Sequence, residues 1–350
     1  MKKLMMKGVE AIGEGAIRAG CRNYFGYPIT PQSELTEYMA RRLPEVGGSF
    51  LQAESEVAAV NMIYGASSVG KRVMTSTSSP GFSLMQEGIS YIACAQLPAV
   101  FVNVVRGGPG LGDIQPSQGD YFQATKGGGH GDYRLIVLSP STVQEAADLT
   151  MLAFDMADRY RNPVLIFADG LLGQMMEPVS FEEKEVTYDN SSWALTGAKG
   201  RSPRQVTSFN IDPYGLEKMN MELQKKYRQI EANEIRYEEY RTEDADVLIV
   251  AHGTVGRIAK SVVKMAREEG IKAGLFRPIT LYPFAYEALS KYGEKTKLVL
   301  TVEMSSGQML EDVKLSLCNK TRIEFYGRMA GVVPTPEEVF AHLKSLIGRQ

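Results

Sequence analysis

Short apolar runs alternate with helical segments along most of this 350-residue chain. The run at 98–105 is apolar along nearly its whole length, instead of at every second position, and the run at 72–77 is also expected to form a buried strand. Strands of that kind are buried on both faces, as in parallel sheets that helices cover on both sides. The same alternation returns at 246–251 and 298–303. The sequence therefore predicts an α/β fold with two successive parallel-sheet domains.

Apolar residues three and four positions apart predict helices in the segments that connect these strands. We expect Ser141 and Gln144 to form the capping box of one such helix. The strand at 162–169 is expected to close the first sheet, and residues 252–256 to form a tight turn. Further helices are expected at 7–21, 32–42, 82–96 and 257–269.

A segment of different character separates the two predicted domains. Residues 181–208 are polar and rich in turn formers, whereas residues 213–240 are charged and follow a helical pattern. We interpret the segment as an arm followed by a connecting helix, because a long irregular segment usually serves a partner or a function. The predicted division of the chain is 1–178, 179–241 and 242–350.

The composition argues against several classes of protein. The net charge of −2 gives no general electrostatic attraction to nucleic acid or to an anionic membrane. The three cysteines stand far apart and form no Cys-x-x-Cys pair, so we expect no metal site or iron–sulfur cluster in this chain. No apolar run has the length of a membrane span, and the N-terminus has too short an apolar part for a signal peptide. We expect a cytoplasmic protein with no nucleic-acid or membrane partner.

An acidic pair, Glu54 and Glu56, follows a short extended start at Phe50 and precedes a helix that we expect to end at Gly65. Two interpretations are open at this point. Acidic side chains favour helix N-termini because they meet the positive end of the helix dipole. Alternatively, one of the two carboxylates is partly buried and serves to hold a proton for a bound ring.

Two other predicted strands end at residues that suit a ligand. Prolines fix the turn at 28–31, so Thr30 is held there either as the cap of the next helix or as a ligand contact. Arg106 follows the strand at 98–105, where it either binds a substrate carboxylate at two oxygens or forms a surface or interface ion pair. The glycines after Arg106 are not a dinucleotide fingerprint, because Pro109 interrupts them and no helix follows at the right place.

The motifs at these strand ends are Tyr27-Pro28-Ile29-Thr30-Pro31, Gln52-Ala53-Glu54-Ser55-Glu56, Thr77-Ser78-Ser79-Pro80-Gly81 and Arg106-Gly107-Gly108-Pro109. Together they resemble the α subunit of the 2-oxoacid:ferredoxin oxidoreductases, which are thiamin-diphosphate enzymes. The similarity covers nearly the whole chain, and residues 277–283 resemble the transketolase C-terminal domain. The loop at 110–118 and the overall length are most similar to the branched-chain, 3-methyl-2-oxobutanoate group. The resemblance implies a pyrimidine-type thiamin-diphosphate-binding fold followed by a transketolase C-terminal-like domain.

The resemblance also implies roles for single residues. Glu56 matches the glutamate that bonds the aminopyrimidine ring of thiamin diphosphate, and Glu54 is closer to a plain helix-start acid. Thr30 and Arg106 match positions that hold the carbonyl and the carboxylate of the 2-oxoacid. The oxoacid would lose carbon dioxide, coenzyme A would take the acyl group, and ferredoxin would receive the electrons. The residues expected to line the cofactor are Tyr27, Pro28, Ile29, Glu56, Ser79 and Gly81.

Part of the expected site has no counterpart in this sequence. A thiamin enzyme binds magnesium and diphosphate with a Gly-Asp-Gly motif followed by an asparagine, and Ala168-Asp169-Gly170 does not fit that pattern. The resemblance implies that a β subunit binds magnesium and the diphosphate. An iron–sulfur ferredoxin-like subunit and a γ subunit would complete the assembly. This chain would then supply half of a shared site.

Two alternatives to the branched-chain interpretation are open. One is the same chemistry on 2-oxoglutarate or an arylpyruvate, and a dicarboxylate would want an additional cation in the pocket. The other is a non-catalytic scaffold whose thiamin-like fold only organises partners. The presence of Glu56, Thr30 and Arg106 argues against the scaffold.

Overall fold

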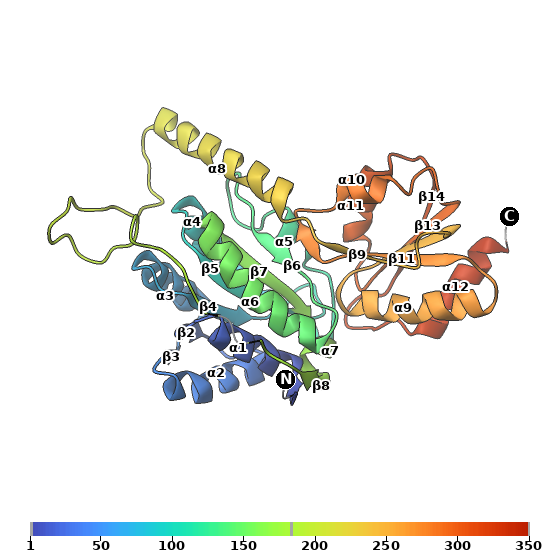
Figure 1. Ribbon diagram of the computed structural model, residues 1–350, viewed down its shortest axis with the longest axis horizontal. Helices are drawn as coiled ribbons and strands as arrows, with labels where there is room; N and C mark the ends of the chain where they lie inside the picture. The colour runs from blue at the N-terminus through green and yellow to red at the C-terminus, as the bar shows by residue number, and fades with distance from the viewer. Residues whose placement is uncertain (1–2, 183–184, 349–350) are drawn as a thin grey trace.

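The computed structural model describes residues 3–182 and 185–348, and it divides into two α/β units that lie side by side along the long axis (Figure 1). The first unit is built on a seven-stranded sheet of order β12-β6-β7-β5-β4-β2-β3. All neighbours in it pair in parallel except β12, which runs antiparallel to β6. Its strands are β2 (Asn23–Gly26), β3 (Ser49–Gln52), β4 (Val73–Thr77), β5 (Ala99–Val105), β6 (Ile136–Leu138), β7 (Pro163–Asp169) and β12 (Thr280–Tyr282).

Helices cover both faces of the first sheet, which explains why its central strands β5 and β7 and the short β6 are apolar along most of their length. In β5, Val100, Val102 and Val104 pack with the helices of one face, while Phe101 and Val105 pack with those of the other. The first face carries α1 (Gly8–Arg18), α2 (Ser33–Glu45) and α6 (Val143–Tyr160), and the second carries α3 (Glu56–Ser68), α4 (Ser79–Cys94) and α5 (Tyr121–Thr125). A two-stranded sheet of β1 (Leu4–Lys7) and β8 (Met176–Val179) and the short α7 (Gly170–Gln174) complete this unit.

The second unit has a five-stranded sheet of order β14-β13-β10-β11-β9, in which only β9 is antiparallel to its neighbour. Between helices on its two faces, the apolar strands are again buried. The strands are β9 (Tyr237–Tyr240), β10 (Val247–Val250), β11 (Ala273–Pro278), β13 (Leu298–Glu303) and β14 (Arg322–Gly327). The helices are α9 (Gly253–Glu268), α10 (Tyr286–Ser290), α11 (Gln308–Leu317) and α12 (Pro336–Ile347).

The segment between the units is an irregular arm followed by α8 (Pro213–Asn233), as the sequence indicates. Helix α8 lies along the first unit and buries Leu223, Tyr227 and Ile230 against it. The arm projects from the body as an open loop before the chain returns to α8 (Figure 1). Three segments, 1–178, 179–241 and 242–350, stay our predicted division of the chain.

Several predicted boundaries are wrong. Helix α3 continues past Gly65 to Ser68, because Gly65 lies on an open helix face and Gly70 is the glycine with a positive φ of 78° at the turn. The helical pattern at 213–240 ends at Asn233, and its last four residues form β9, which pairs with β11.

Two other corrections concern helix starts and the sheet edge. Thr142, not Ser141, caps α6, and its hydroxyl accepts from the N–H of Glu145 at 3.1 Å. Helix α9 already begins at Gly253, so the predicted turn is its first helical turn. Strand β7 does not close the first sheet. It lies inside the sheet, and β12 from the C-terminal half forms that edge.

Among the residues that the structure describes, no helix is both long and apolar enough to cross a membrane. The same residues contain no group of three or more histidines, cysteines or acids placed to hold a metal ion.

Candidate functional site

The motifs from the sequence meet at one edge of the first sheet. Strands β5, β4, β2 and β3 are neighbours in that order and run in parallel, so their carboxyl ends lie at the same edge. The turn at 28–31 follows β2, Glu56 follows β3, residues 78–81 follow β4, and Arg106 follows β5. This edge of a parallel sheet is where α/β folds bind ligands.

Glu56 is the buried member of the acidic pair. It is 4% exposed at the first position of α3, whereas Glu54 is exposed. The capping of α3 is done by Ser55, whose hydroxyl accepts from the N–H of Ala58 at 3.1 Å. The Glu56 carboxylate makes no hydrogen bond or ion pair with any residue that the structure describes. A buried acid without a partner costs stability, so capping alone does not explain this side chain.

Gly81, in the first turn of α4, faces that carboxylate. A Cβ atom added to Gly81 would lie 2.4 Å from Oε1 of Glu56 and 2.1 Å from Oγ1 of Thr77. The hydroxyls of Thr77 and Ser78 are themselves buried and have no hydrogen-bond partner within the described chain. The edge therefore presents a cluster of buried polar atoms whose hydrogen-bonding capacity is unused, which is what a small polar ring would require.

Arg106 joins two of the motifs. Its side chain is nearly buried, and it donates from Nη1 to the carbonyl of Thr30 at 2.9 Å and from Nη2 to the carbonyl of Leu111 at 2.8 Å. Its Nε has no partner among the described residues. It forms no ion pair with a carboxylate of the described residues, and the alternative of an ion pair at an interface stays a prediction. A buried guanidinium with a free N–H retains capacity for an anion.

Thr30 is exposed and does not cap the next helix. Gln32 occupies the N-cap position of α2, and no side chain closes that cap. The Thr30 hydroxyl makes no hydrogen bond with any described residue. The capping interpretation is therefore wrong, and the hydroxyl is available to a ligand.

The sequence analysis missed the buried network that holds the 28–31 turn. Gln32 is fully buried and donates from Nε2 to the carbonyl of Tyr27 at 3.1 Å. Its Oε1 accepts from Ser76 Oγ at 2.6 Å and from Thr36 Oγ1 at 3.0 Å. Tyr24 completes the network with a bond of 2.6 Å to Ser76. The signal in the sequence was the run of three hydroxyl residues, Thr75-Ser76-Thr77, in a strand predicted to be buried.

A second missed group lies next to Arg106. Asn103 is the polar residue within β5, and its Nδ2 donates to Oδ2 of Asp120 at 2.9 Å. Burial raises the pKa of Asp120 above its ordinary value, although hydrogen bonds from Ser79 and Asn103 and the charge of Arg106 act in the opposite direction. Ser79 Oγ accepts from the N–H of Arg106 at 3.0 Å.

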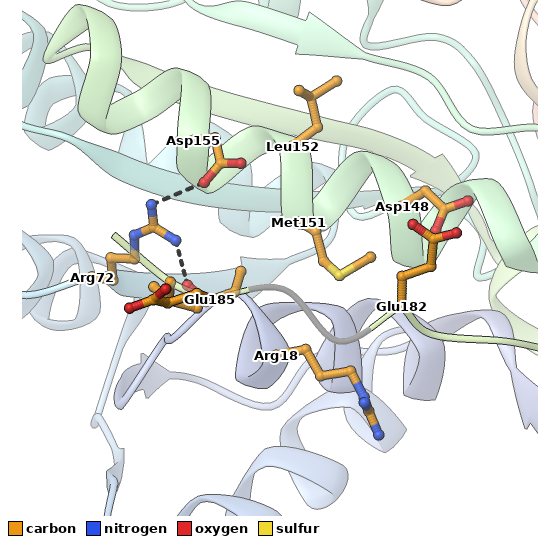
Figure 2. A pocket seen from close by; sticks show the side chains of 10 residues that line it. Arg18, Arg72, Asp148, Met151, Leu152, Asp155, Glu182 and Glu185 are labelled. Atoms are coloured by element: carbon orange, nitrogen blue, oxygen red, sulfur yellow. Dashed lines mark hydrogen bonds and ion pairs between the residues drawn. The ribbon is translucent and has the colours of Figure 1, made fainter. Parts of the chain in front are cut away.

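Two cavities of about 490 Å³ each open at this edge. One is lined by Ser79, Asp120 and the loops around Met304 and Met329 of the second unit. The other is lined by Thr30 together with Pro31, Ile114, Pro116 and Leu171, among others. A third cavity, of about 600 Å³, lies near Arg72 at the amino end of β4, away from these residues (Figure 2).

The fold and this strand-end site define a thiamin-diphosphate type of α/β chain. The family model described as pyruvate flavodoxin/ferredoxin oxidoreductase, thiamine-diphosphate-binding, matches residues 14–246. The model described as pyruvate:ferredoxin oxidoreductase core domain II matches residues 245–339. The chain belongs to the 2-oxoacid:ferredoxin oxidoreductase family, as a subunit.

Similar proteins include two named ketoisovalerate oxidoreductase subunit VorB. The one from Methanothermobacter marburgensis is 51% identical over 99% of both chains, and the one from Methanothermobacter thermautotrophicus is 50% identical over the same shares. A protein named 2-oxoglutarate synthase subunit KorA, from Archaeoglobus fulgidus, is 37% identical over 94% of this chain and 96% of its own. These relatives confirm the resemblance to the α-type subunits, with higher identity to the branched-chain group.

Solved structures confirm the fold. The 2-oxoglutarate:ferredoxin oxidoreductase from Magnetococcus marinus superposes with a TM-score of 0.88 at 28% identity, over 99% of this chain. This chain spans 65% of the length of that one. A split-gene transketolase superposes with a TM-score of 0.62 at 16% identity, over 98% of both chains, and shows likeness of fold alone.

Proposed function

We propose that this chain is the α-type subunit of an enzyme that oxidatively decarboxylates 3-methyl-2-oxobutanoate to its acyl-CoA and passes the electrons to ferredoxin. The identity of about half its residues with the two VorB subunits supports the branched-chain substrate. A physical argument for the same choice comes from the cavity beside Thr30.

That cavity is the observation that carries the choice of substrate. Its lining contains Ile114 and Leu171 and has no lysine or arginine. Its one acid is Glu34, whose pKa lies below the ordinary value because Lys7 bonds to it at 2.7 Å. Lys7 is already paired with Glu34, so the lining offers no free cation to the second carboxylate of 2-oxoglutarate, whereas a branched apolar side chain would pack on Ile114 and Leu171.

Glu56 is the residue that we assign to the pyrimidine end of thiamin diphosphate. When bound, the cofactor accepts the electron pair that is released as the 2-oxoacid loses carbon dioxide. Glycine at position 81 lets the Glu56 carboxylate lie close against α4, because a Cβ there would be only 2.4 Å from Oε1. The unpartnered carboxylate and the unpaired hydroxyls of Thr77 and Ser78 fit a polar ring at this edge. Oε1 would share a proton with the ring nitrogen. Tyr27, Pro28, Ile29, Ser79 and Gly81 would line the rest of the cofactor.

Thr30 and Arg106 are assigned to the substrate. The unbonded hydroxyl of Thr30 would donate to the oxo oxygen as negative charge develops on it. Arg106 holds the backbone of Thr30 in place, and its free Nε would donate to the substrate carboxylate. The rigid turn and the shared guanidinium keep both groups at fixed positions before substrate arrives.

The rest of the active site is proposed to come from partner chains in the cytoplasm. A β subunit would bind magnesium and the diphosphate, and an iron–sulfur ferredoxin-like subunit would carry the electrons to ferredoxin. A γ subunit would complete the complex, with coenzyme A as the acyl acceptor.

The purified complex tests this proposal through the ratio of its kcat/KM values for two substrates. We expect 3-methyl-2-oxobutanoate to be preferred over 2-oxoglutarate by about 10- to 100-fold, because the lining offers apolar contact to a branched chain and no free cation to a second carboxylate. The exchange Ile114→Lys supplies the missing cation and should move the ratio toward 2-oxoglutarate, while Ile114→Met should not. A native complex that prefers 2-oxoglutarate would contradict the assignment.

A further inference from the structure

The cavity of Figure 2 has a surplus of negative charge that the proposed reaction does not use. It lies between α1 and α6, has a volume of about 600 Å³, and has Met151 and Leu152 in its wall. We call it the acidic cavity. Three of its acids, Asp148, Glu182 and Glu185, form no ion pair with a described residue.

The two arginines at the acidic cavity are already engaged elsewhere. Arg72 is buried and bonds to Asp155 at 3.0 Å and to Asp158 at 2.6 Å. Arg18 bonds to Glu14 at 2.9 Å and lies over the ring of Phe181. Figure 2 shows the Arg72–Asp155 pair, with Arg18 pointing away from it. Among the residues that the structure describes, no cation is therefore left for the three remaining acids of the cavity.

The negative charge of the cavity affects the titration of Asp148. Its pKa is raised above the ordinary value, first by burial and then by the charges of Glu145 and Glu182, and a hydrogen bond from Gln144 opposes the rise only in part. A cation placed among these acids would relieve their mutual repulsion.

The chain carries a matching positive element nearby. Residues 190–211, which we call the basic arm, contain Lys199, Arg201 and Arg204 and no acidic residue. None of the three forms an ion pair with a described residue. The arm projects from the body (Figure 1), and Phe209 and Ile211 on its return limb are 75% and 86% exposed. Exposed apolar groups beside unpaired charges are typical of a surface that another chain covers.

The base of the basic arm is fixed beside the acidic cavity. Asn190 bonds to the carbonyl of Gly70, and the N–H of Leu195 bonds to the carbonyl of Ser68 at 2.9 Å. Trp193 is covered by the guanidinium of Arg161 at 4.7 Å from its ring centre. The return limb is held as well, because Arg204 donates to the carbonyl of Ala194 at 2.9 Å and Val206 packs against the core. Residues 196–203 therefore form the projecting tip of the arm. Half of this tip, about four residues, can span up to roughly 13 Å when extended.

We propose that the basic arm docks into the acidic cavity of a second copy of this chain, so that two copies exchange arms reciprocally. Three basic residues then meet three acids, and the same contact is made twice around a two-fold axis, which closes the assembly at two copies. Phe209 and Ile211 would lose solvent contact against the second copy. The proposal is independent of the identity of the oxoacid.

A charge exchange tests the proposal on the full-length chain. Variant A carries Lys199→Glu, Arg201→Glu and Arg204→Glu, and variant B carries Asp148→Lys, Glu182→Lys and Glu185→Lys. In either variant alone, arm and cavity have like charge, so the dimer dissociation constant should rise at least about 100-fold. In an equimolar mixture of A and B both contacts have opposite charge, so a dimer of one A and one B should form.

Sedimentation velocity and native mass spectrometry at micromolar concentration measure these outcomes. A control chain with Lys264→Glu, Lys291→Glu and Lys295→Glu has the same change in net charge as variant A, but on the second unit. This control should dimerise like the native chain. Circular dichroism and thermal unfolding check that A and B are folded. A monomeric native chain, a dimer that survives in A, or a mixture of A and B that stays monomeric would each overturn the proposal, and so would an arm that binds only a partner subunit.

Discussion

Two buried glutamates occupy similar places in the two α/β units, and their surroundings differ. Glu303 ends β13 and is fully buried, and its carboxylate accepts from Ser305 Oγ at 2.8 Å and from the N–H groups of Met309 and Leu310 at 2.9 Å. Glu56 follows β3, is nearly as buried, and has no bond to any described residue. Glu303 fixes the start of α11 through these hydrogen bonds, whereas Glu56 makes no hydrogen bond to the N–H groups of α3.

This difference distinguishes an acid with a structural role, Glu303, from a candidate functional acid, Glu56. A buried carboxylate is tolerated when hydrogen bonds replace those that it made to water, as at Glu303. At Glu56 the replacement is missing, and the hydroxyls of Thr77 and Ser78 beside it are unpaired as well. The first unit thus retains unused polar groups at its strand ends. A ligand that supplies the missing bonds is the physical reason to retain them.

The largest effect is expected for Glu56→Gln. The variant keeps the shape of the side chain but cannot hold or release the proton, and the loss of such a group typically lowers the rate about 10²- to 10⁴-fold. Turnover by the reconstituted complex measures this, with Glu54→Gln as the matched control. Native activity in a folded, cofactor-loaded Glu56→Gln complex would show that Glu56 has no catalytic role, and the contrast with Glu303 would lose its functional meaning.

Thr30→Val tests the neighbouring strand end. It removes one hydroxyl and keeps the β-branched shape, so a rate decrease of about 10²- to 10³-fold is expected if the hydroxyl stabilises developing charge. Thermal stability should hardly change, because Thr30 does not cap α2. Single-turnover decarboxylation and a thermal melt are the two readouts. A destabilised variant with normal turnover would support a structural role instead.

Arg106→Lys should lower kcat/KM about 10- to 100-fold, since a charge-assisted hydrogen bond contributes roughly 1.5–3 kcal/mol. Lysine cannot span the carbonyls of Thr30 and Leu111 and also offer a third donor to the substrate. Thiamin diphosphate binding by the complex should be close to native. Unchanged kinetics would mean that Arg106 only supports the loop.

The smallest effect on activity is expected for Glu303→Gln, which should instead lower the free energy of unfolding by about 1–3 kcal/mol, because the amide leaves at least one N–H unpaired. Burial raises the pKa of Glu303 above its ordinary value. The folded chain therefore retains this proton to higher pH than the unfolded chain, and stability falls as the pH rises from the unfolded to the folded pKa. Denaturant unfolding at several pH values should show this slope in the native chain and not in the variant. Lost activity in stable Glu303→Gln chains would contradict the contrast with Glu56.

Residues near in sequence made most of the fold predictable. The alternation of apolar strands and helices depends on local spacing, and it predicts both parallel sheets correctly. Strand β12 is placed by its pairing with β6, in which Thr280 lies opposite Leu138. The pattern of neighbouring residues in the sequence does not indicate that pairing. Strand β9 was missed because Tyr237–Tyr240 continues the charged pattern of α8 and is fixed only by pairing with β11.

The site shows the same limit. Thr30, Glu56 and Arg106 each follow a predicted strand of one parallel sheet, so their position at one sheet edge could be predicted from the sequence. The bond from Arg106 to the backbone of Thr30 could not, since it depends on the path of the loop that contains Leu111. Gln32 and Asp120 were missed because their burial arises from distant chain segments.

Isothermal titration of thiamin diphosphate and magnesium into the lone chain tests the central claim, that this chain supplies only the pyrimidine half of a shared site. Glu56 and its neighbours offer contacts to one uncharged ring, and a few kcal/mol cannot offset an association cost of about 4–15 kcal/mol. The account predicts no saturable binding by the lone chain and tight, magnesium-dependent binding once the β subunit is added. Micromolar, magnesium-dependent binding by this chain alone would contradict it.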